Sequence, residues 1–502
     1  MRLEQLCSGL AGVELPRAAA QLDVNAVRGD SRQVQPGDLF VAVPGEEQDG
    51  AEFVKEAVTK GAIGIVAETA LDAPVPVVVV PDARLALATL TAEALGRPAD
   101  SLVLAGITGT LGKTSVLSMV EAILKADGVP VGTVGSLGIH WDGHDDTTPN
   151  TTPGAGELQE AMAGMVEAGT RVMAMEVTSH ALMQGRVHGL MYDVGVFTNL
   201  AMLEHMEYHG TFAGYVDAKL RFFQHLKPQA PLVFSAGDRA VSAAARRHGG
   251  PRISVGGGNS IVTVRRSAMS LDGTKITLNV RRPLCRVGDA PLEPTAFTIQ
   301  LATLGRTNAA NASIAAAAAL VLGATAESVQ SALAQMRPPP RRLQVLQHHG
   351  PVVIDDTVGH PDSITGVFEV AQRVPHRRLH VVFCIRGQRG GVINQRDAEA
   401  LAIWSRQVPI HSFVTTSGDD SADERNRVEA EERDAFLSVI QAAGLRHRHH
   451  ERLADAVEAM LDEVHEDDLV LLLGAQGMDA GAELLRQGLE TRGLANPMTE
   501  RP

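Results

Sequence analysis

The stretch LVLAGITGTLGKTS, residues 102–115, decides the fold of the centre of this chain. An apolar strand leads into a glycine-rich turn, and Lys113 and Thr114 then open a helix with apolar residues at helical spacing. Gly109 and Gly112 let the turn wrap around an anion, because glycine reaches backbone dihedrals that other residues avoid. The N–H groups of such a turn, together with the helix N-terminus, face phosphates. The pattern predicts a nucleoside triphosphate site.

The side chains of this turn have roles that follow from their chemistry. Lys113 can neutralise charge on the β- and γ-phosphates, and the Thr114 hydroxyl can bind Mg²⁺. The strict pattern G-x-x-x-x-G-K-[ST] is broken at one position, because Ile107 stands where the first glycine is expected. The strand before the turn and the helix after it still favour a phosphate-binding loop.

The composition excludes several classes of protein. A net charge of −14 disfavours nucleic acid as a partner, since phosphate contacts need a basic face. We expect no membrane span, because no apolar run approaches about 18 residues. The start MRLEQLCSGL lacks the basic and long apolar regions of a signal peptide. Three scattered cysteines fit a reduced compartment. We therefore expect a cytoplasmic protein. We also expect a monomer.

Two breaks in composition divide the 502 residues. GRPAD at 96–100 reads as a linker, and RPPPR at 337–341 reads as a rigid break. Apolar strands alternate with helices on both sides of each break, which predicts parallel sheets with ligands at the carboxyl ends of the strands. We therefore expect an α/β protein with three domains, at residues 1–98, 99–337 and 338–502.

Four segments have a more particular character. Residues 252–303 are rich in β-branched residues and predict an antiparallel insert or sheet edge. The alanine-rich run 309–319 predicts a closely packed core helix. The acidic stretch 418–434 predicts a solvated loop and helix face. We expect no metal at RHRHH, residues 446–450, because these histidines lack convergent spacing.

Several motifs together resemble one known family. They are RGDSRQ at 28–33, TGTLGKTS at 108–115, NTTP at 150–153, MEVTSH at 175–180 and LGRTNAANA at 304–312. They resemble motifs of the Mur ligases, ATP-dependent enzymes that form amide bonds in cell-wall precursors. The branch that adds the third residue of the stem peptide is the most similar. The resemblance implies a uridine-diphosphate-binding domain, a central P-loop ATPase domain and a Rossmann-like third domain.

The resemblance also implies roles for single residues. Lys113, Glu176, His205 and Lys219 match catalytic positions, and Lys219 matches a lysine that is carbamylated to give an N6-carboxylysine metal ligand. Thr114, Glu176, His205 and carbamylated Lys219 would then bind Mg²⁺. The ATP-binding positions are Gly109, Thr110, Gly112, Lys113, Thr114, Ser115, Asn308 and Arg342, and the substrate-binding positions are Ser31, Arg32, Asn150, Thr151, Thr152, Thr178, Gln184 and Arg186.

The implied reaction joins an acid to an amine. A uridine-diphosphate-linked muramyl peptide and a free amino acid would be the substrates, with ATP and two Mg²⁺ ions. The peptide carboxylate attacks the γ-phosphate, where Lys113 and Mg²⁺ stabilise the spread charge. An amine held by the third domain then attacks the acyl phosphate, and domain closure keeps water out.

The third domain departs most from the family pattern. Gly418-Asp419-Asp420-Ser421 replaces the D-N-P-R motif of diaminopimelate-adding members, and Asp479 ends a changed G-K-G-H-E motif. We therefore hypothesise that the added amine is not diaminopimelate and that Asp419, Asp420 and Asp479 favour a basic side chain; the alternative is a solvated acidic loop. Two other functions stay open: a Mur-type ligase with another acid and amine, and an ATP-binding homologue that has lost its chemistry.

Overall fold

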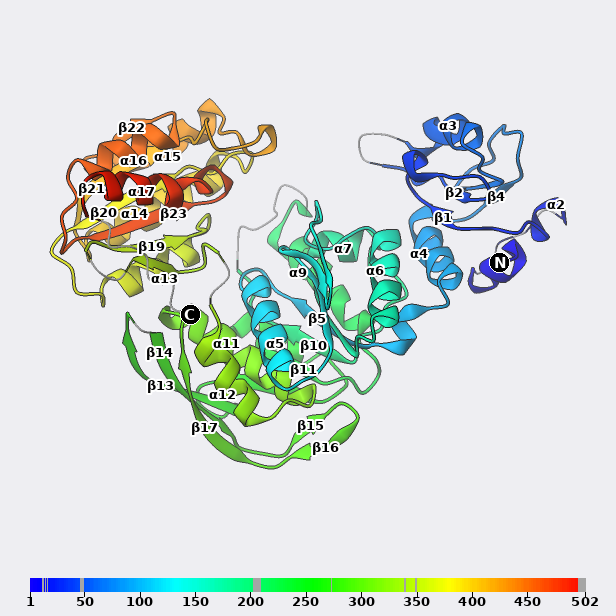
Figure 1. Ribbon diagram of the computed structural model, residues 1–502, viewed down its shortest axis with the longest axis horizontal. Coiled ribbons are helices and arrows are strands. Elements are labelled where there is room, and N and C mark those ends of the chain that lie inside the picture. Colours follow the sequence, from blue (N-terminus) through cyan, green and yellow to red (C-terminus); the bar gives the residue numbers. More distant parts are fainter. Residues whose placement is uncertain are drawn as a thin grey trace.

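The computed structural model contains three α/β units in chain order, with the middle unit lying between the other two (Figure 1). The structure describes residues 1–10, 13, 15, 17–45, 49–201, 209–271, 273–337, 340–347 and 350–494. Within these ranges, no helix is both long enough and apolar enough to cross a membrane. The α/β class predicted from the alternation of strands and helices is confirmed. The domain borders after residues 98 and 337 stay predictions.

The first unit is a small parallel sheet flanked by short helices. Its order is β1-β2-β3-β4, with every neighbouring pair parallel. Its core consists of aliphatic residues from the sheet and from α1 and α4. The elements are β1 (Val27–Arg28), β2 (Leu39–Val41), β3 (Gly64–Ala67), β4 (Val77–Val79), α1 (Leu3–Leu6), α2 (Arg17–Ala20), α3 (Val54–Thr59) and α4 (Ala83–Ala94).

The second unit is built on an eleven-stranded sheet of order β17-β14-β13-β12-β11-β10-β5-β9-β6-β7-β8. Its middle is parallel, and both edges are antiparallel. The antiparallel edge predicted within 252–303 is confirmed for β13, β14 and β17. The strands are β5 (Val103–Thr108), β6 (Val131–Gly135), β7 (Gly138–Trp141), β8 (His144–Asp146), β9 (Val172–Glu176), β10 (Val194–Phe197), β11 (Leu232–Ser235), β12 (Arg252–Gly256), β13 (Val262–Ser270), β14 (Gly273–Val280) and β17 (Thr295–Leu301), with a separate hairpin of β15 (Leu284–Arg286) and β16 (Asp289–Leu292).

The alanine-rich run forms the buried helix α11 (Gly305–Val321), as predicted. Its side chains from Ala315 to Ala319 are at most 1% exposed, because small residues let the helix approach both the sheet and its neighbour α5 (Lys113–Ala126). This packing fixes the start of α11 beside the start of α5. The other helices of this unit are α6 (Ala155–Glu167), α7 (Ser179–Met183), α9 (Phe212–Leu220), α10 (Arg239–Ala245) and α12 (Ala326–Gln335).

The third unit has a six-stranded sheet of order β18-β19-β23-β20-β21-β22, parallel except for β18. The RHRHH segment supplies the edge strand β22, where His449 Nδ1 lies 3.0 Å from Thr415 Oγ1. The elements are β18 (Gln344–Gln347), β19 (Val352–Asp356), β20 (Leu379–Cys384), β21 (Ile410–Thr416), β22 (Arg448–His450), β23 (Leu469–Gly474), α13 (Pro361–Ala371), α14 (Gly391–Ser405), α15 (Ala430–Ala442), α16 (Leu453–Leu461) and α17 (Gly481–Thr491).

A substitution at Gly106 on β5 can test how tightly the centre of the large sheet is packed. A Cβ added there would lie 2.8 Å from Phe222 Cε2 and 3.0 Å from Tyr192 Cδ2, whereas one added at Gly156 on α6 would meet open space. We expect Gly106→Ala to lower the free energy of unfolding by about 1–3 kcal/mol through overpacking. We expect Gly156→Ala to leave it unchanged or to raise it by up to about 1 kcal/mol. Denaturant unfolding of both variants measures the difference, and equal effects would contradict this packing.

Candidate active site

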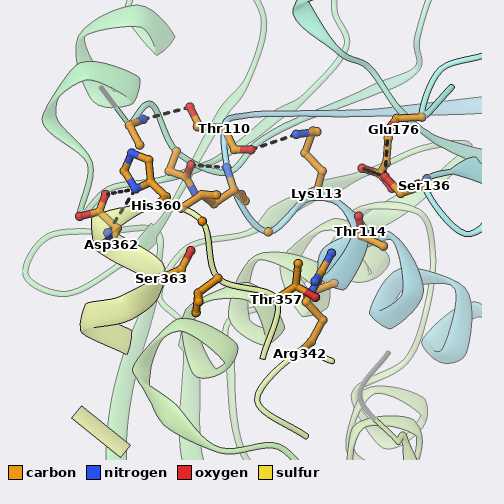
Figure 2. A pocket seen from close by; sticks show the side chains of 18 of the residues that line it. Thr110, Lys113, Thr114, Ser136, Glu176, Arg342, Thr357, His360, Asp362 and Ser363 are labelled. Carbon is orange, nitrogen blue, oxygen red and sulfur yellow. Dashed lines mark hydrogen bonds and ion pairs between the residues drawn. The ribbon is translucent and has the colours of Figure 1, made fainter. Parts of the chain in front are cut away.

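The loop between β5 and α5 has the geometry of a phosphate cradle. Gly109 and Gly112 have φ values of 143° and 80°, which favour glycine over other residues. A Cβ at Gly112 would lie 2.6 Å from Asn311 Oδ1, so a larger residue there would displace the Asn311 amide. Lys113 Nζ donates to the carbonyls of Gly109 at 3.1 Å and Thr110 at 3.0 Å, which places the ammonium group over the loop (Figure 2).

The apex of this loop is fixed by two side chains that follow β10. Asn199 accepts from the Leu111 N–H through Oδ1 and donates to the Leu111 carbonyl through Nδ2, both at 2.8 Å. Thr198 Oγ1 donates to the same carbonyl at 2.7 Å. The fold uses only the backbone of Leu111, which explains why leucine is accommodated at a position where the resembling family has asparagine.

Lys219 belongs to α9 and is only 1% exposed. Its Nζ atom lies 5.0 Å from the ring centroid of Tyr215, one helical turn earlier. The Tyr215 hydroxyl lies 2.8 Å from Thr110 Oγ1, which connects α9 directly to the phosphate loop. Lys219 does not line the cavity described below. His205, predicted as a metal ligand, lies outside the described residues.

A buried carboxylate stands at the end of the next strand, β9. Glu176 is 1% exposed, and its Oε1 accepts from the Ser136 N–H at 2.9 Å. Its backbone carbonyl accepts from Thr152 Oγ1 at 2.8 Å, and the same hydroxyl accepts from the Thr178 N–H at 3.2 Å. Arg186 Nη1 donates to the Thr152 carbonyl at 2.7 Å. These contacts gather the NTTP and MEVTSH segments at one place.

One cavity of about 770 Å³ joins these groups to the third unit. Figure 2 shows Arg342 and Thr357 near Thr114, and Ser363 near His360 and Asp362. The predicted site residues that line it are Thr110, Gly112, Lys113, Thr114, Ser115, Asn150, Thr151, Thr152, Glu176, Thr178, Arg186, Asn308 and Arg342.

Besides Lys219, four of the predicted site residues that the structure describes do not line this cavity. Gly109 belongs to the same loop, and Gln184 accepts from Arg186 Nε at 2.9 Å, so both lie next to it. Ser31 and Arg32 belong to the first unit: Ser31 Oγ donates to Glu56 Oε2 at 2.8 Å, and Arg32 is paired with Asp30. The structure therefore does not bring the Asp30-Ser31-Arg32 segment to the cavity.

Several cavity residues were not among the predicted site residues. Ser136, His180, Asn199 and Thr307 come from the second unit, and Asp356, His360, Arg386 and Arg389 from the third. Asn199 could have been found from its place after a buried strand of the parallel sheet. Ser136 carries no comparable signal, because no motif marks it, although both its N–H and its hydroxyl contact Glu176.

Asp356 is the most perturbed acid in the cavity wall. Burial raises the pKa of its carboxyl to about 7, against an opposing effect of the nearby Arg342. Its Oδ2 accepts from the Leu343 N–H at 2.7 Å. Burial also raises the pKa of Asp355, where the Arg341 guanidinium opposes the shift. The third unit thus contributes a carboxyl that titrates close to neutral pH.

Two of the three acidic residues expected to select a basic side chain have structural partners. Asp420 accepts from the backbone N–H groups of Leu453 at 2.6 Å and Ala454 at 3.2 Å, at the start of α16. Asp479 is ion-paired with Arg341. Neither these two carboxylates nor Asp419 lines the cavity, so the structure gives no support to a basic side chain.

Three family descriptions match successive parts of the chain. They are "Mur ligase family, catalytic domain" at residues 23–94, "Mur ligase middle domain" at 107–319 and "Mur ligase, glutamate ligase domain" at 341–476. The chain belongs to the Mur ligase family. It is 32% identical over 483 residues to UDP-N-acetylmuramoyl-L-alanyl-D-glutamate–2,6-diaminopimelate ligase of Geobacillus thermodenitrificans (strain NG80-2), with 94% of each chain covered. The ligase of that name in Listeria innocua serovar 6a is 42% identical over 226 residues, 45% of this chain and 46% of that one.

Solved structures of this family have the same fold as the chain. A UDP-N-acetylmuramoyl-L-alanyl-D-glutamate–2,6-diaminopimelate ligase superposes with a TM-score of 0.67 at 21% identity, covering 99% of this chain and 100% of the other. MurF ligase from Thermotoga maritima in complex with ADP gives a TM-score of 0.64 at 20% identity, covering 94% and 99%. The three-unit Mur ligase architecture expected from the motifs is confirmed.

The raised pKa of Asp356 predicts a pH dependence of stability. The folded state keeps a proton that the unfolded state releases near pH 4, so this contribution is lost as the pH rises from about 4 through about 7. Asp356→Asn cannot titrate, and its amide oxygen can still accept from Leu343. We expect the wild type to lose stability relative to this variant between pH 5 and pH 8, measured by denaturant unfolding. If the free energies of unfolding of the two proteins changed equally with pH, the raised pKa of Asp356 would be contradicted.

Proposed function

We propose that the chain is an ATP-dependent ligase that adds an amino acid to a UDP-N-acetylmuramoyl dipeptide, as a cytoplasmic monomer. The observation that supports this most is the shared cavity, which joins a phosphate loop, a buried carboxylate and an arginine-bearing wall of the third unit. A ligase that uses ATP must hold a triphosphate, an acid and an amine within reach of one another. The names of the relatives support the choice of acid.

The residues of the second unit would act on the triphosphate. The loop N–H groups and the N-terminus of α5 would bind its phosphates, and Lys113 would stabilise the charge that spreads over the transferred group. Asn308 and Asn311, at the start of α11, would contact the adenine side. Asn308 Nδ2 donates to the Leu304 carbonyl at 3.0 Å, which leaves its amide oxygen able to accept.

The acid would be activated and then consumed in two steps. A carboxylate oxygen of the dipeptide attacks the γ-phosphorus, ADP leaves, and an acyl phosphate forms. The nitrogen of the amino acid then attacks the acyl carbon, the C–O bond to phosphate breaks, and the nitrogen loses a proton as the amide forms. Arg186, Thr152 and Thr178 would orient the dipeptide between these steps. Enclosure by the second and third units would keep water from the acyl phosphate.

The donor set at the cavity fits Mg²⁺. Thr114 and Glu176 both line it and offer oxygen atoms, which are the ligands that Mg²⁺ prefers. Among the described residues there is no cluster of three His, Cys, Asp or Glu side chains able to hold a metal. Mg²⁺ bound at these oxygens would neutralise phosphate charge. We propose two ions, with a carbamylated Lys219 adding a carboxylate to their surroundings.

A second candidate function is ligation of a different amino acid, or of a different pair of acid and amine. Gly418-Asp419-Asp420-Ser421 stands where diaminopimelate-adding members have D-N-P-R, so the guanidinium of that motif is missing. This favours an amino acid other than diaminopimelate, or another acid and amine pair. The residues that line the second unit's part of the cavity favour an active ligase over an ATP-binding homologue without activity.

The proposed function is tested by ligation followed by mass spectrometry. The purified chain is incubated with ATP, Mg²⁺, the UDP-linked muramyl dipeptide and a pool of amino acids that includes diaminopimelate. We expect one new product mass, equal to the dipeptide plus one amino acid minus water, with one ADP per product. A product with diaminopimelate at an ordinary rate would refute the second function. ATP binding without any product would contradict ligation.

Lys219→Ala tests the carbamate role. We expect this variant to lose at least about a hundredfold in rate, because the carboxylate proposed to lie near the Mg²⁺ ions is removed, and we expect short carboxylates such as acetate to restore part of the rate. Lys125→Ala is the control, since Lys125 is exposed and paired with Glu121 at 2.6 Å, and it should keep the wild-type rate. Absence of rescue, or an unimpaired Lys219→Ala variant, would count against a carbamate.

A further inference from the structure

The loop at residues 386–390 carries two arginines to the cavity. It follows β20, precedes α14, and contributes Arg386 and Arg389 to the cavity wall. Gln388 within it has a φ of 57°, an uncommon value for a residue other than glycine, and Gly390 has a φ of 78°. A loop in this conformation needs contacts that hold it.

A single buried carboxylate supplies those contacts. Glu432 on α15 is 3% exposed, and its Oε1 accepts from the N–H groups of Arg389 and Gly390, both at 2.7 Å. Its Oε2 accepts from the N–H groups of Gln388 at 3.1 Å and Glu429 at 3.0 Å. Three successive N–H groups of the loop thus converge on one side chain, an arrangement typical of an anion-binding nest. The nest is filled from within the protein.

This finding corrects the sequence-based expectation for residues 418–434. The acidic stretch was expected to be solvated, and that expectation is wrong for Glu432. Backbone N–H donors satisfy the carboxylate, and charge-assisted hydrogen bonds of this kind are stronger than neutral ones. The buried Glu432 carboxylate therefore holds the backbone of the 386–390 loop.

The other end of the loop is held by Asn394 on α14, which is fully buried. Its Oδ1 accepts from the Arg386 N–H at 3.1 Å, and its Nδ2 donates to the Arg386 carbonyl at 2.8 Å. Arg386 Nη1 in turn donates to the Gly359 carbonyl at 2.8 Å. The backbone that carries both guanidinium groups is thus fixed from two helices.

We propose that Glu432 is a positioning residue for the incoming amino acid. It holds the 388–390 backbone so that Arg389, with Arg386, presents guanidinium groups to a carboxylate of that amino acid. Guanidinium groups bind carboxylates in a planar, two-point geometry, so a displaced backbone weakens binding steeply. The proposal rests on the proposed ligase function. Glu432 itself does not line the cavity and acts only through the loop.

Glu432→Gln is the principal test. The glutamine amide has an NH₂ group in place of one carboxylate oxygen. This NH₂ donor would face the N–H donors of the loop and could not accept from them. We expect KM for the amino acid to rise by at least about tenfold. A rise of this size corresponds to the loss of one or more hydrogen bonds to a charged group. We expect KM for ATP to change by less than about twofold, since the phosphate loop keeps its own contacts. Amide hydrogen exchange at residues 388–390 should be faster than in the wild type.

Glu431→Gln is the matched control, because Glu431 is the preceding residue, carries the same charge and is exposed. Both KM values and the exchange at 388–390 should stay at wild-type levels in it. Glu432→Asp is the second variant, and it serves if the Gln variant does not fold. It keeps the charge but withdraws it by one methylene, and we expect an intermediate rise in KM for the amino acid.

The outcomes separate the two proposals. Unchanged exchange at 388–390 in a folded Glu432 variant, or equal rises in KM for ATP and for the amino acid, would overturn the positioning role. A wild-type protein that ligates no amino acid would instead contradict the proposed function. In that case faster exchange confined to 388–390 in Glu432→Gln would still support the anchoring of the loop, and unchanged exchange would overturn it.

Discussion

The parallel pairing of β5 with β9 on one side and β10 on the other is the constraint on which the site depends. The carboxyl ends of these strands meet at one edge of the sheet, as in other open parallel sheets. The phosphate loop follows β5, Glu176 ends β9, and Asn199 follows β10. Three segments that are far apart in the sequence therefore share one edge. The alanine-rich helix α11 adds Asn308 and Asn311 by packing closely against α5.

The third unit completes the site by the same principle. Asp356 ends β19, the 386–390 loop follows β20, and Ala475 and Gln476 follow β23, so all three come from the carboxyl ends of a second parallel sheet. The two edges face one cavity. This arrangement allows one sheet to bind the triphosphate and the acid while the other binds the amine, and it makes relative movement of the units a means to admit substrates and exclude water.

The parts of the site that the sequence predicted best are those in which backbone geometry or strand ends determine function. Gly112 and Lys113 of the phosphate loop, Glu176, and Asn150, Thr151 and Thr152 of the NTTP segment line one cavity, and their roles stay predictions. The sequence could not predict that Ser31 and Arg32 lie away from the cavity, because it carries no information on the angle between the first and second units. Glu432 was missed for a different reason. An acidic residue among others suggests solvent, and only the fold shows three loop N–H groups converging on it.

Ligation through an acyl phosphate transfers one oxygen atom from the acid to the phosphate, and this transfer can be measured with an isotope. The reacting carboxylate of the muramyl dipeptide is labelled with ¹⁸O, and the phosphate released during ligation is examined by mass spectrometry. We expect one ¹⁸O atom in each phosphate released, because the attacking carboxylate oxygen leaves with phosphorus. Product formation with unlabelled phosphate would contradict ligation through an acyl phosphate.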